Sequence, residues 1–165
     1  TYMIYQEGIY VGYKYYETRY EDFVMGTGNA GNYAYKDAVA FPFGYGLSYT
    51  EFEYSNLEIE KFASNDTLAK VSCKIKNIGS RDGQEVVQLY INDVIASVKE
   101  DGALLKNFKK IFLKKGESKQ ITFYIKEEDL SFYNYEMKEI VEKGEFEILI
   151  GQFSNNIKLK GSFTL

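Results

Sequence analysis

The side chains with the most obvious chemistry in this chain are its carboxylates, which could act in pairs as a general acid and a general base. The 165 residues include 24 aspartates and glutamates, so close pairs such as Glu127 with Glu128 or Glu58 with Glu60 are expected by number alone. Both pairs lie in or beside segments that read as strands with outward polar faces. Solvated carboxylates explain this pattern, because Asp and Glu are seldom buried unless they are paired. We therefore predict no catalytic residue.

Other reactive groups are few. Histidine is absent, which removes the commonest metal ligand and the usual base for a serine or cysteine nucleophile. The single cysteine, Cys73, stands at an apolar position of an alternating segment, which predicts a buried thiol that packs as a small hydrophobic group. We predict no metal site, and one cysteine cannot form a disulfide within the chain.

A glycine-rich segment, Gly26-Thr27-Gly28-Asn29-Ala30-Gly31, matches the spacing of a dinucleotide-binding loop. Such a loop needs a strand before it and a helix after it, because the helix N-terminus meets the pyrophosphate. The residues that follow, 32–37, show no sustained apolar period of 3.6. We therefore predict an irregular loop and no cofactor.

Composition and charge narrow the class of protein further. The chain is 45% hydrophobic and 27% charged, which is ordinary for one or two small globular domains. A net charge of −4 without a basic stripe argues against a nucleic-acid partner. No apolar run approaches the roughly 18 residues of a membrane helix, so no membrane partner is predicted.

Strands dominate the chain from about residue 50 to residue 165. Val71, Cys73 and Ile75 alternate with polar residues, which predicts one face in a core and one in solvent. Similar alternation recurs around residues 52–59, 87–91, 111–113, 121–125, 146–150 and 157–165. About seven strands at this spacing predict an all-β, immunoglobulin-like sandwich. A phase change predicts a bulge near Ser55-Asn56, and Glu127–Leu130 forms one helical turn at most.

The first 49 residues have a different character. Residues 1–23 are aromatic and β-prone, and Ile9 and Val11 alternate with Tyr10 as in a strand. Residues 24–40 are rich in Gly, Asn and Ala, which predicts an irregular loop. We therefore expect an extended, aromatic-rich arm before the sandwich.

The most distinctive motif is Phe41-Pro42-Phe43-Gly44-Tyr45-Gly46-Leu47-Ser48-Tyr49-Thr50, which holds the single proline and four aromatic residues. Residues 7–16 precede it, and the segments at 76–90, 104–118 and 144–151 follow it in order. Together these segments resemble the C-terminal region of a glycoside hydrolase family 3 enzyme, of the β-glucosidase or β-xylosidase type. The resemblance covers nearly the whole chain. It implies that residues 1–49 are an arm and linker from the end of an α/β sandwich domain, and that residues 50–165 form a fibronectin type III-like domain.

The resemblance also locates the family's chemistry outside this chain. The nucleophile of the family comes from an upstream barrel and the acid/base residue from the preceding α/β domain, so the chain alone is expected to be inactive. The aromatic residues near the linker are then expected to pack domains together, with direct sugar stacking as the alternative. The candidates for interdomain packing are Tyr10, Tyr13, Phe41, Phe43, Tyr45 and Tyr49.

The expected function is that of a non-catalytic accessory domain that braces the catalytic domains of a β-glycosidase in carbohydrate metabolism. The alternative is a carbohydrate- or partner-binding module. The expected partners are the upstream barrel and α/β domains, and the arm could also pair with a second copy of the chain. We expect residues 1–45 to fold back on the sandwich, to pair with a neighbour, or to be disordered. The family has cytoplasmic and secreted members, so the resemblance does not decide the compartment.

Overall fold

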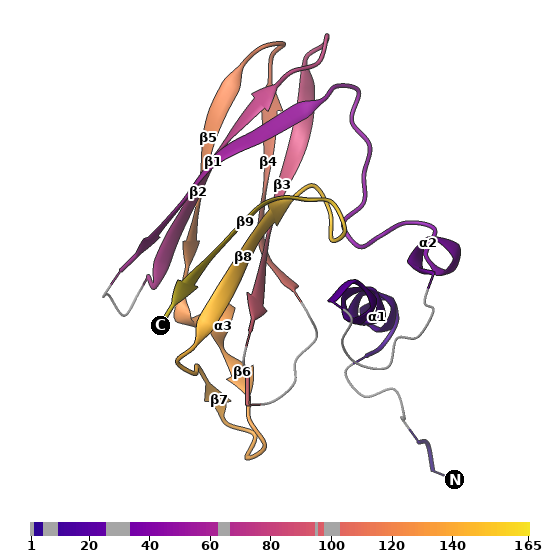
Figure 1. Ribbon diagram of the computed structural model, residues 1–165, viewed down its shortest axis with the longest axis vertical. Coiled ribbons are helices and arrows are strands. Elements are labelled where there is room, and N and C mark those ends of the chain that lie inside the picture. The colour runs from indigo at the N-terminus through magenta and orange to yellow at the C-terminus, as the bar shows by residue number, and fades with distance from the viewer. Residues whose placement is uncertain (1, 5–9, 26–33, 63–66, 95, 98–102) are drawn as a thin grey trace.

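The larger part of the computed structural model is a sandwich of two antiparallel sheets (Figure 1), and the structure describes residues 2–4, 10–25, 34–62, 67–94, 96–97 and 103–165. The three-stranded sheet has the order β1 (Phe52–Lys61), β2 (Ala69–Asn77), β5 (Ser118–Ile125). The four-stranded sheet has the order β4 (Leu104–Leu113), β3 (Gly83–Asp93), β8 (Glu145–Gly151), β9 (Ile157–Thr164). The predicted sandwich of about seven strands is confirmed.

Shorter elements complete the described part of the sandwich. One helical turn, α3 (Glu127–Leu130), follows β5, as the sequence predicted. A small hairpin of β6 (Phe132–Tyr133) and β7 (Glu139–Ile140) precedes β8.

The core lies between the two sheets, and strict alternation of side chains fills it. Val71, Cys73 and Ile75 of β2 are buried, and Leu89 of β3 and Ile148 of β8 face them from the other sheet. Each apolar residue removed from water in this way stabilises the folded state by about 1.5–3 kcal/mol. The predicted burial of Cys73 is confirmed, since its side chain is 1% exposed.

A bulge re-aims β1 in the middle of the strand. The pairing of β1 with β2 shifts register between Ser55 and Glu58, and Asn56 adopts a φ of 54°. The bulge predicted near Ser55-Asn56 is therefore confirmed. It brings Leu57 and Ile59 back to the inner face, where both are half-buried against the core.

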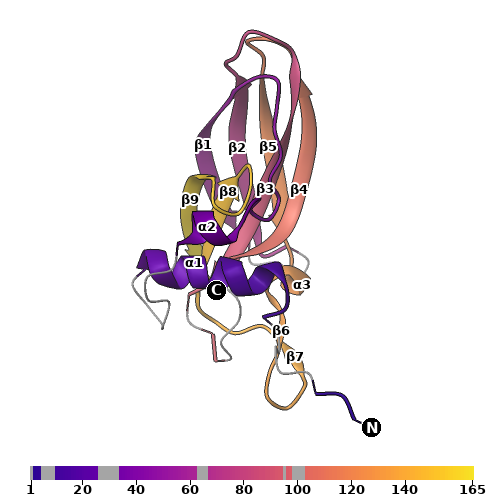
Figure 2. The ribbon, with the colours of Figure 1, turned by 90° about the vertical axis from the view of Figure 1, so that its right-hand side faces the viewer.

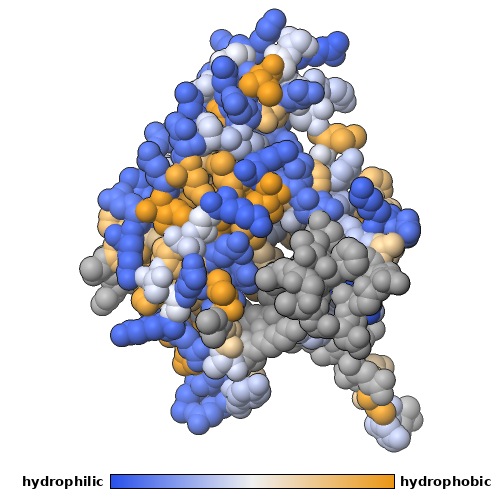
Figure 3. Space-filling view, in the orientation of Figure 1, coloured by the Kyte–Doolittle hydropathy of each residue, from blue (hydrophilic) through white to orange (hydrophobic). Residues whose placement is uncertain are grey.

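β1 and β9 approach each other along one side of the sandwich. A Cβ at Gly161 of β9 would lie 2.8 Å from Cδ1 of Ile59, so a larger residue there would force the Ile59 side chain to shift. The Nζ of Lys61 donates to the carbonyl of Thr164 over 2.6 Å and ties the ends of the two strands together. Figure 3 shows an apolar area over this side of the molecule.

The arm contains a helix where the sequence predicted a β-prone segment. Helix α1 spans Tyr13–Met25, and a single turn, α2, spans Tyr35–Ala38. The prediction was wrong because aromatic residues have only a weak, context-dependent preference for strands. Tyr13–Met25 lacks Gly and Pro, and Arg19 donates to the hydroxyl of Tyr15 one turn earlier, over 3.1 Å.

Two other predictions for the arm have different outcomes. Tyr10 and Val11 are not in a strand, and Ile9 lies outside the described residues. The glycine-rich segment 26–31 also lies outside them, so its predicted loop is untested. No helix in the described ranges is long and apolar enough to cross a membrane.

The arm lies against the outer face of the four-stranded sheet. In Figure 2, α1 and α2 lie in front of β3 and β8, and in Figure 1 they lie beside the same sheet. Tyr90 and Leu149 point to this outer face yet are buried, because the arm covers them. Residues 10–25 and 34–45 thus fold back on the sandwich, the first of the three expected outcomes, whereas residues 2–4 are exposed and extend away from it (Figure 1).

Candidate functional site

The junction between the linker and the four-stranded sheet holds a buried amide. Gln88 stands on the outer face of β3 and is 5% exposed. Its Nε2 donates to the carbonyl of Gly44 over 3.0 Å and to the carbonyl of Gln152 over 2.5 Å. Its Oε1 accepts a hydrogen bond of 2.5 Å from the hydroxyl of Tyr90. One side chain therefore ties the linker, the β8–β9 turn and β3 together, and a buried amide needs such partners.

Gly44 is the residue that lets the linker come this close. The amide of Tyr45 donates to the carbonyl of Pro42 over 3.1 Å, which closes a turn in which Gly44 has a φ of 78°. This is the position of a type II turn that favours glycine. A Cβ on Gly44 would also lie 2.3 Å from Oε1 of Gln88. Gly46 has no atom within 4 Å of such a Cβ, so only Gly44 is required by close contact.

A second buried polar group, Glu85, lies at the inner face of β3. Its carboxylate accepts a hydrogen bond of 2.9 Å from the hydroxyl of Tyr54 on the facing sheet, and Nε2 of Gln152 lies 3.3 Å and 3.4 Å from its two oxygens. Burial raises the pKa of Glu85, although the hydrogen bonds from Tyr54 and Gln152 oppose the shift. Burial, and then the charge of Glu85, raise the pKa of Tyr54. Gln152 thus links the core to the Gln88 site.

Helix α1 is fixed to the same junction by a carboxylate. Oε1 of Glu17 accepts a hydrogen bond of 2.5 Å from the hydroxyl of Tyr35 and one of 3.2 Å from the amide of Phe43. The rings of Tyr13 and Phe43 stack at 4.5 Å. Burial raises the pKa of Tyr90, and the nearby Glu17 and Tyr13 raise it further. α1 therefore lies over Tyr90 and the linker.

The aromatic residues predicted for interdomain packing fall into two groups. The structure pairs Tyr13 with Phe43, and it places Tyr45 5.2 Å from Phe41 and 5.2 Å from Phe153. Within the described residues, Tyr10 and Tyr49 make no ring contact, and Tyr49 is 92% exposed. The packing of this set against a separate domain stays a prediction.

The end of the linker is anchored by Asn77, whose side chain is fully buried. Its Nδ2 donates to the carbonyls of Arg81 and Leu113, over 2.8 Å and 3.1 Å. Its Oδ1 accepts from the hydroxyl of Thr50 over 2.8 Å and from the amide of Gly79 over 3.1 Å. All four hydrogen-bonding positions of the amide are therefore used, and they fix the linker where it enters β1.

Sequence reasoning missed the polar residues that build this junction. They are Glu17, Gln88, Tyr90, Glu85, Gln152 and Asn77. In sequence, Gln88 and Tyr90 occupy positions of β3 that an isolated sandwich would expose. Only the cover supplied by the arm makes them buried, and the strand pattern carries no signal for it.

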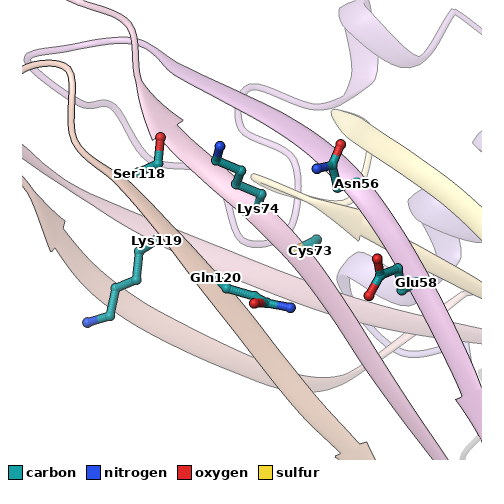
Figure 4. Close-up of a pocket in the computed structure, with 7 residues that line it drawn as sticks. All are labelled: Asn56, Glu58, Cys73, Lys74, Ser118, Lys119 and Gln120. Carbon is teal, nitrogen blue, oxygen red and sulfur yellow. The ribbon is translucent and has the colours of Figure 1, made fainter.

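A separate hollow of about 280 Å³ lies on the three-stranded sheet beside the bulge (Figure 4). Its lining is polar and has no aromatic ring, and Lys119 extends away from Glu58 in Figure 4. Burial raises the pKa of the Cys73 thiol to about 11, so this thiol is not a reactive nucleophile at neutral pH. The residues that line it are Asn56, Glu58, Cys73, Lys74, Ser118, Lys119 and Gln120.

The described ranges also contain no group of three or more metal-ligating side chains. The hydrogen bonds of the junction join the linker to α1 and to the sandwich.

Comparisons with known proteins agree with this picture. The family model of the fibronectin type III-like domain matches residues 85–154. The chain is 42% identical over 160 residues to thermostable β-glucosidase B of Acetivibrio thermocellus. This alignment covers 96% of the chain and 19% of that enzyme. It is 44% identical over 131 residues to a putative β-xylosidase of Formosa agariphila, and that alignment covers 79% of this chain and 17% of the relative.

Solved structures show the same relationship. β-Glucosidase 3B of Thermotoga neapolitana superposes with a TM-score of 0.78 at 39% identity, over 98% of this chain and 20% of that enzyme. A family 3 β-glucosidase of Bifidobacterium adolescentis superposes with a TM-score of 0.78 at 32% identity. The chain spans about a fifth of the length of these relatives. It corresponds to the C-terminal region of glycoside hydrolase family 3 enzymes, with their fibronectin type III-like domain.

Proposed function

We propose that the chain is the non-catalytic accessory part of a β-glycosidase of carbohydrate metabolism, and that it braces the catalytic domains of that enzyme. The observation that carries the proposal is the two-sided character of the arm and linker. Their inner side is fixed to the sandwich by Gln88 and by the amide of Ser154, while Phe41 and Tyr49 on their outer side are 70% and 92% exposed. Large exposed apolar side chains in one segment indicate a surface that another protein part covers.

The boundary between the two parts is proposed at the linker. Residues 1–49 would be the arm and linker from the end of an α/β sandwich domain, and residues 50–165 the fibronectin type III-like domain. One contact and one strand boundary support this division. Thr50 is held by Asn77 of the sandwich, and β1 begins at Phe52.

The proposed bracing follows from the order of these contacts along the chain. The linker is fixed at Gly44 by Gln88, at Phe43 by Glu17 and by its carbonyl to the amide of Ser154, and at Thr50 by Asn77. A linker held at several points cannot swing freely, so a domain attached through it would keep one orientation. The rings of α1 and the linker that face solvent would then add contact area with the catalytic domains.

A chimeric enzyme tests the proposal. The matching C-terminal region of the Acetivibrio thermocellus β-glucosidase B, which is 42% identical to this chain, would be deleted or replaced by the chain. We expect the deletion to lower the melting temperature and the β-glucosidase activity, and the replacement to restore both. Replacing Phe41 and Tyr49 with Ala in the chimera should lower its melting temperature by about 3 °C.

The matched control uses exposed aromatic residues elsewhere on the sandwich. Tyr124→Ala and Tyr133→Ala remove rings that are also largely exposed, but they lie on β5 and β6 and far from the linker in sequence. These changes should leave the melting temperature of the chimera unchanged. Equal stability of the deleted and restored enzymes would contradict the proposed bracing.

Self-association is proposed for the chain on its own. The aromatic surface that upstream domains would cover is then open to a second copy, and exposed apolar area favours association. Sedimentation velocity over a range of concentrations would measure it, and we expect Phe41→Ala with Tyr49→Ala to favour the monomer.

A further inference from the structure

The outer face of β4 carries exposed aromatic rings that the proposed bracing does not use. Phe108 and Phe112 are 61% and 51% exposed. Phe108, Lys110 and Phe112 pair with Gln88, Val86 and Gln84 of β3, so the three side chains share the outer face of the four-stranded sheet. We call these three residues the β4 face. In Figure 2, β4 lies at the edge of the sheet with most of its length above α1.

The two rings have a spacing that suits an extended ligand. Four residues along an antiparallel strand place Phe108 and Phe112 about 13–14 Å apart, on the same side of the sheet. Lys110 stands midway between them. Ile111 and Leu113 alternate with the exposed residues and are buried, so the strand holds the β4 face in one orientation.

Positive charge is concentrated around the same strand. The segment from Leu104 to Lys119 contains six lysines and a single acidic residue, Glu117, in a chain whose net charge is −4. Lys109 points toward β5 and not toward the β4 face. Its Nζ donates to the carbonyl of Thr122 and lies 5.5 Å from the ring of Phe123. The other lysines are Lys106, Lys110, Lys114, Lys115 and Lys119.

We propose that the β4 face binds a polysaccharide that carries carboxylate groups, that is, a glycan containing uronic acids. Phe108 and Phe112 would stack on the apolar faces of two sugar rings. Lys110 would pair with a carboxylate of the glycan chain between those two rings. The surrounding lysines would attract the anionic polymer by long-range electrostatics, which salt screens.

A protein partner fits this surface less well. Lysine is depleted in the centres of protein–protein interfaces, and here a lysine stands between the two exposed rings. The linker and α1 already present a surface with few lysines for other protein domains. A neutral glycan would use the rings but would leave the excess of positive charge without a role.

The test is a set of titrations of the whole chain with three polymers, followed by the amide resonances or by calorimetry. De-esterified polygalacturonate has both sugar rings and carboxylates, fully methyl-esterified pectin has the same rings without the charge, and poly-L-glutamate has the charge without the rings. We expect the strongest binding for polygalacturonate, with shifts on β4 and on the adjoining part of β3.

Substitutions then assign the contacts. Phe108→Ala with Phe112→Ala should weaken polygalacturonate binding by about tenfold, and Lys110→Gln by about threefold. Tyr124→Ala and Lys160→Gln are the matched controls, since they remove an exposed ring from β5 and an exposed lysine from β9. Both controls should bind normally. All variants should keep the unfolding midpoint of the unchanged chain, because the altered side chains are solvent-exposed.

Several results would overturn the proposal. One is equal binding of poly-L-glutamate and polygalacturonate, which would indicate simple charge attraction. Others are equal binding of the esterified polymer, binding that persists without both rings, or the absence of binding at millimolar concentrations of sugar units. Protection of β4 amides in the chimera but not in the isolated chain would instead assign this face to the upstream domains.

Discussion

The core of the sandwich encloses large aromatic rings, whereas the linker exposes two of its own. Phe123 and Phe146 are 1% exposed and pack between the sheets, while Phe41 and Tyr49 face solvent. The core between the two sheets is built by the sandwich itself, because each of its long strands contributes residues to the inner face. The linker contacts the sandwich at Phe43 and Gly44, through Ser154 and Gln88, and Glu17 joins α1 to the linker at Phe43. The difference supports the proposal that the arm is one half of an interface with the upstream domains.

The largest expected effect comes from removing a core ring. Phe123→Ala should lower the free energy of unfolding by about 4 kcal/mol, because it leaves a cavity between the sheets. Phe41→Ala should change it by less than about 0.5 kcal/mol, because that ring is exposed. Urea denaturation measures both. Similar losses for the two variants would contradict the contrast between sandwich and arm.

The anchor between linker and sandwich should have the next largest effect. Asn77→Ala leaves the buried carbonyl of Leu113 and the hydroxyl of Thr50 without partners, which should cost about 3 kcal/mol. Asn155→Ala is the control, since Asn155 is only half-buried and makes no side-chain hydrogen bond within the described residues. Thermal unfolding of both variants would measure the difference, and equal melting temperatures would refute the role of Asn77.

A smaller effect is expected at Gly44, and it should be confined to the arm. Gly44→Ala forces a side chain against Oε1 of Gln88 at a positive φ, which should cost about 2 kcal/mol and release the linker. Gly46→Ala meets no atom within 4 Å and should be tolerated. Amide exchange should speed up in α1 and the linker of the Gly44 variant, while the Cys73 thiol stays unreactive. A rapid reaction of Cys73 would show instead that the whole sandwich had opened.

The pH dependence of stability should report on Glu85. Its pKa is raised above the ordinary value of 4.5 in the folded state, so the folded protein holds this proton more tightly than the unfolded chain. This contribution to stability is fully present below about pH 4.5 and is lost as the pH rises through the folded pKa. Glu85→Gln removes the titrating group, so the variant should gain stability relative to the unchanged chain between mildly acidic and neutral pH. Parallel stability curves for the two proteins would contradict this assignment.

The sequence predicted the sandwich well because a strand with one buried face has an apolar residue at every second position. The core positions of β2 and β5, the bulge at Asn56 and the buried Cys73 all follow from that alternation. The arm was harder, since its aromatic residues are compatible with a strand and with a helix. α1 is decided by contacts with the linker and the sheet, such as Tyr13 with Phe43, and these are not local in sequence.

The buried polar junction could not be predicted for a related reason. Gln88 and Tyr90 look like solvent-facing residues of a strand, and they become buried only because residues from before position 45 cover them. The motif around Gly44 indicated that the linker is structurally important, and the resemblance to family 3 enzymes predicted that its aromatic residues pack domains together. The partners of the motif on the sandwich came from the three-dimensional arrangement alone.

Hydrogen exchange of the arm tests the central claim most directly. Peptides covering residues 10–25 and 34–50 would be compared in the isolated chain and in the chimera with the catalytic domains of the Acetivibrio thermocellus enzyme, with β2 and β8 as internal references. We expect slower exchange of the arm and linker in the chimera and unchanged exchange in the reference strands. Equal exchange of the arm in both proteins would mean that the catalytic domains do not cover it, and the bracing function would be contradicted.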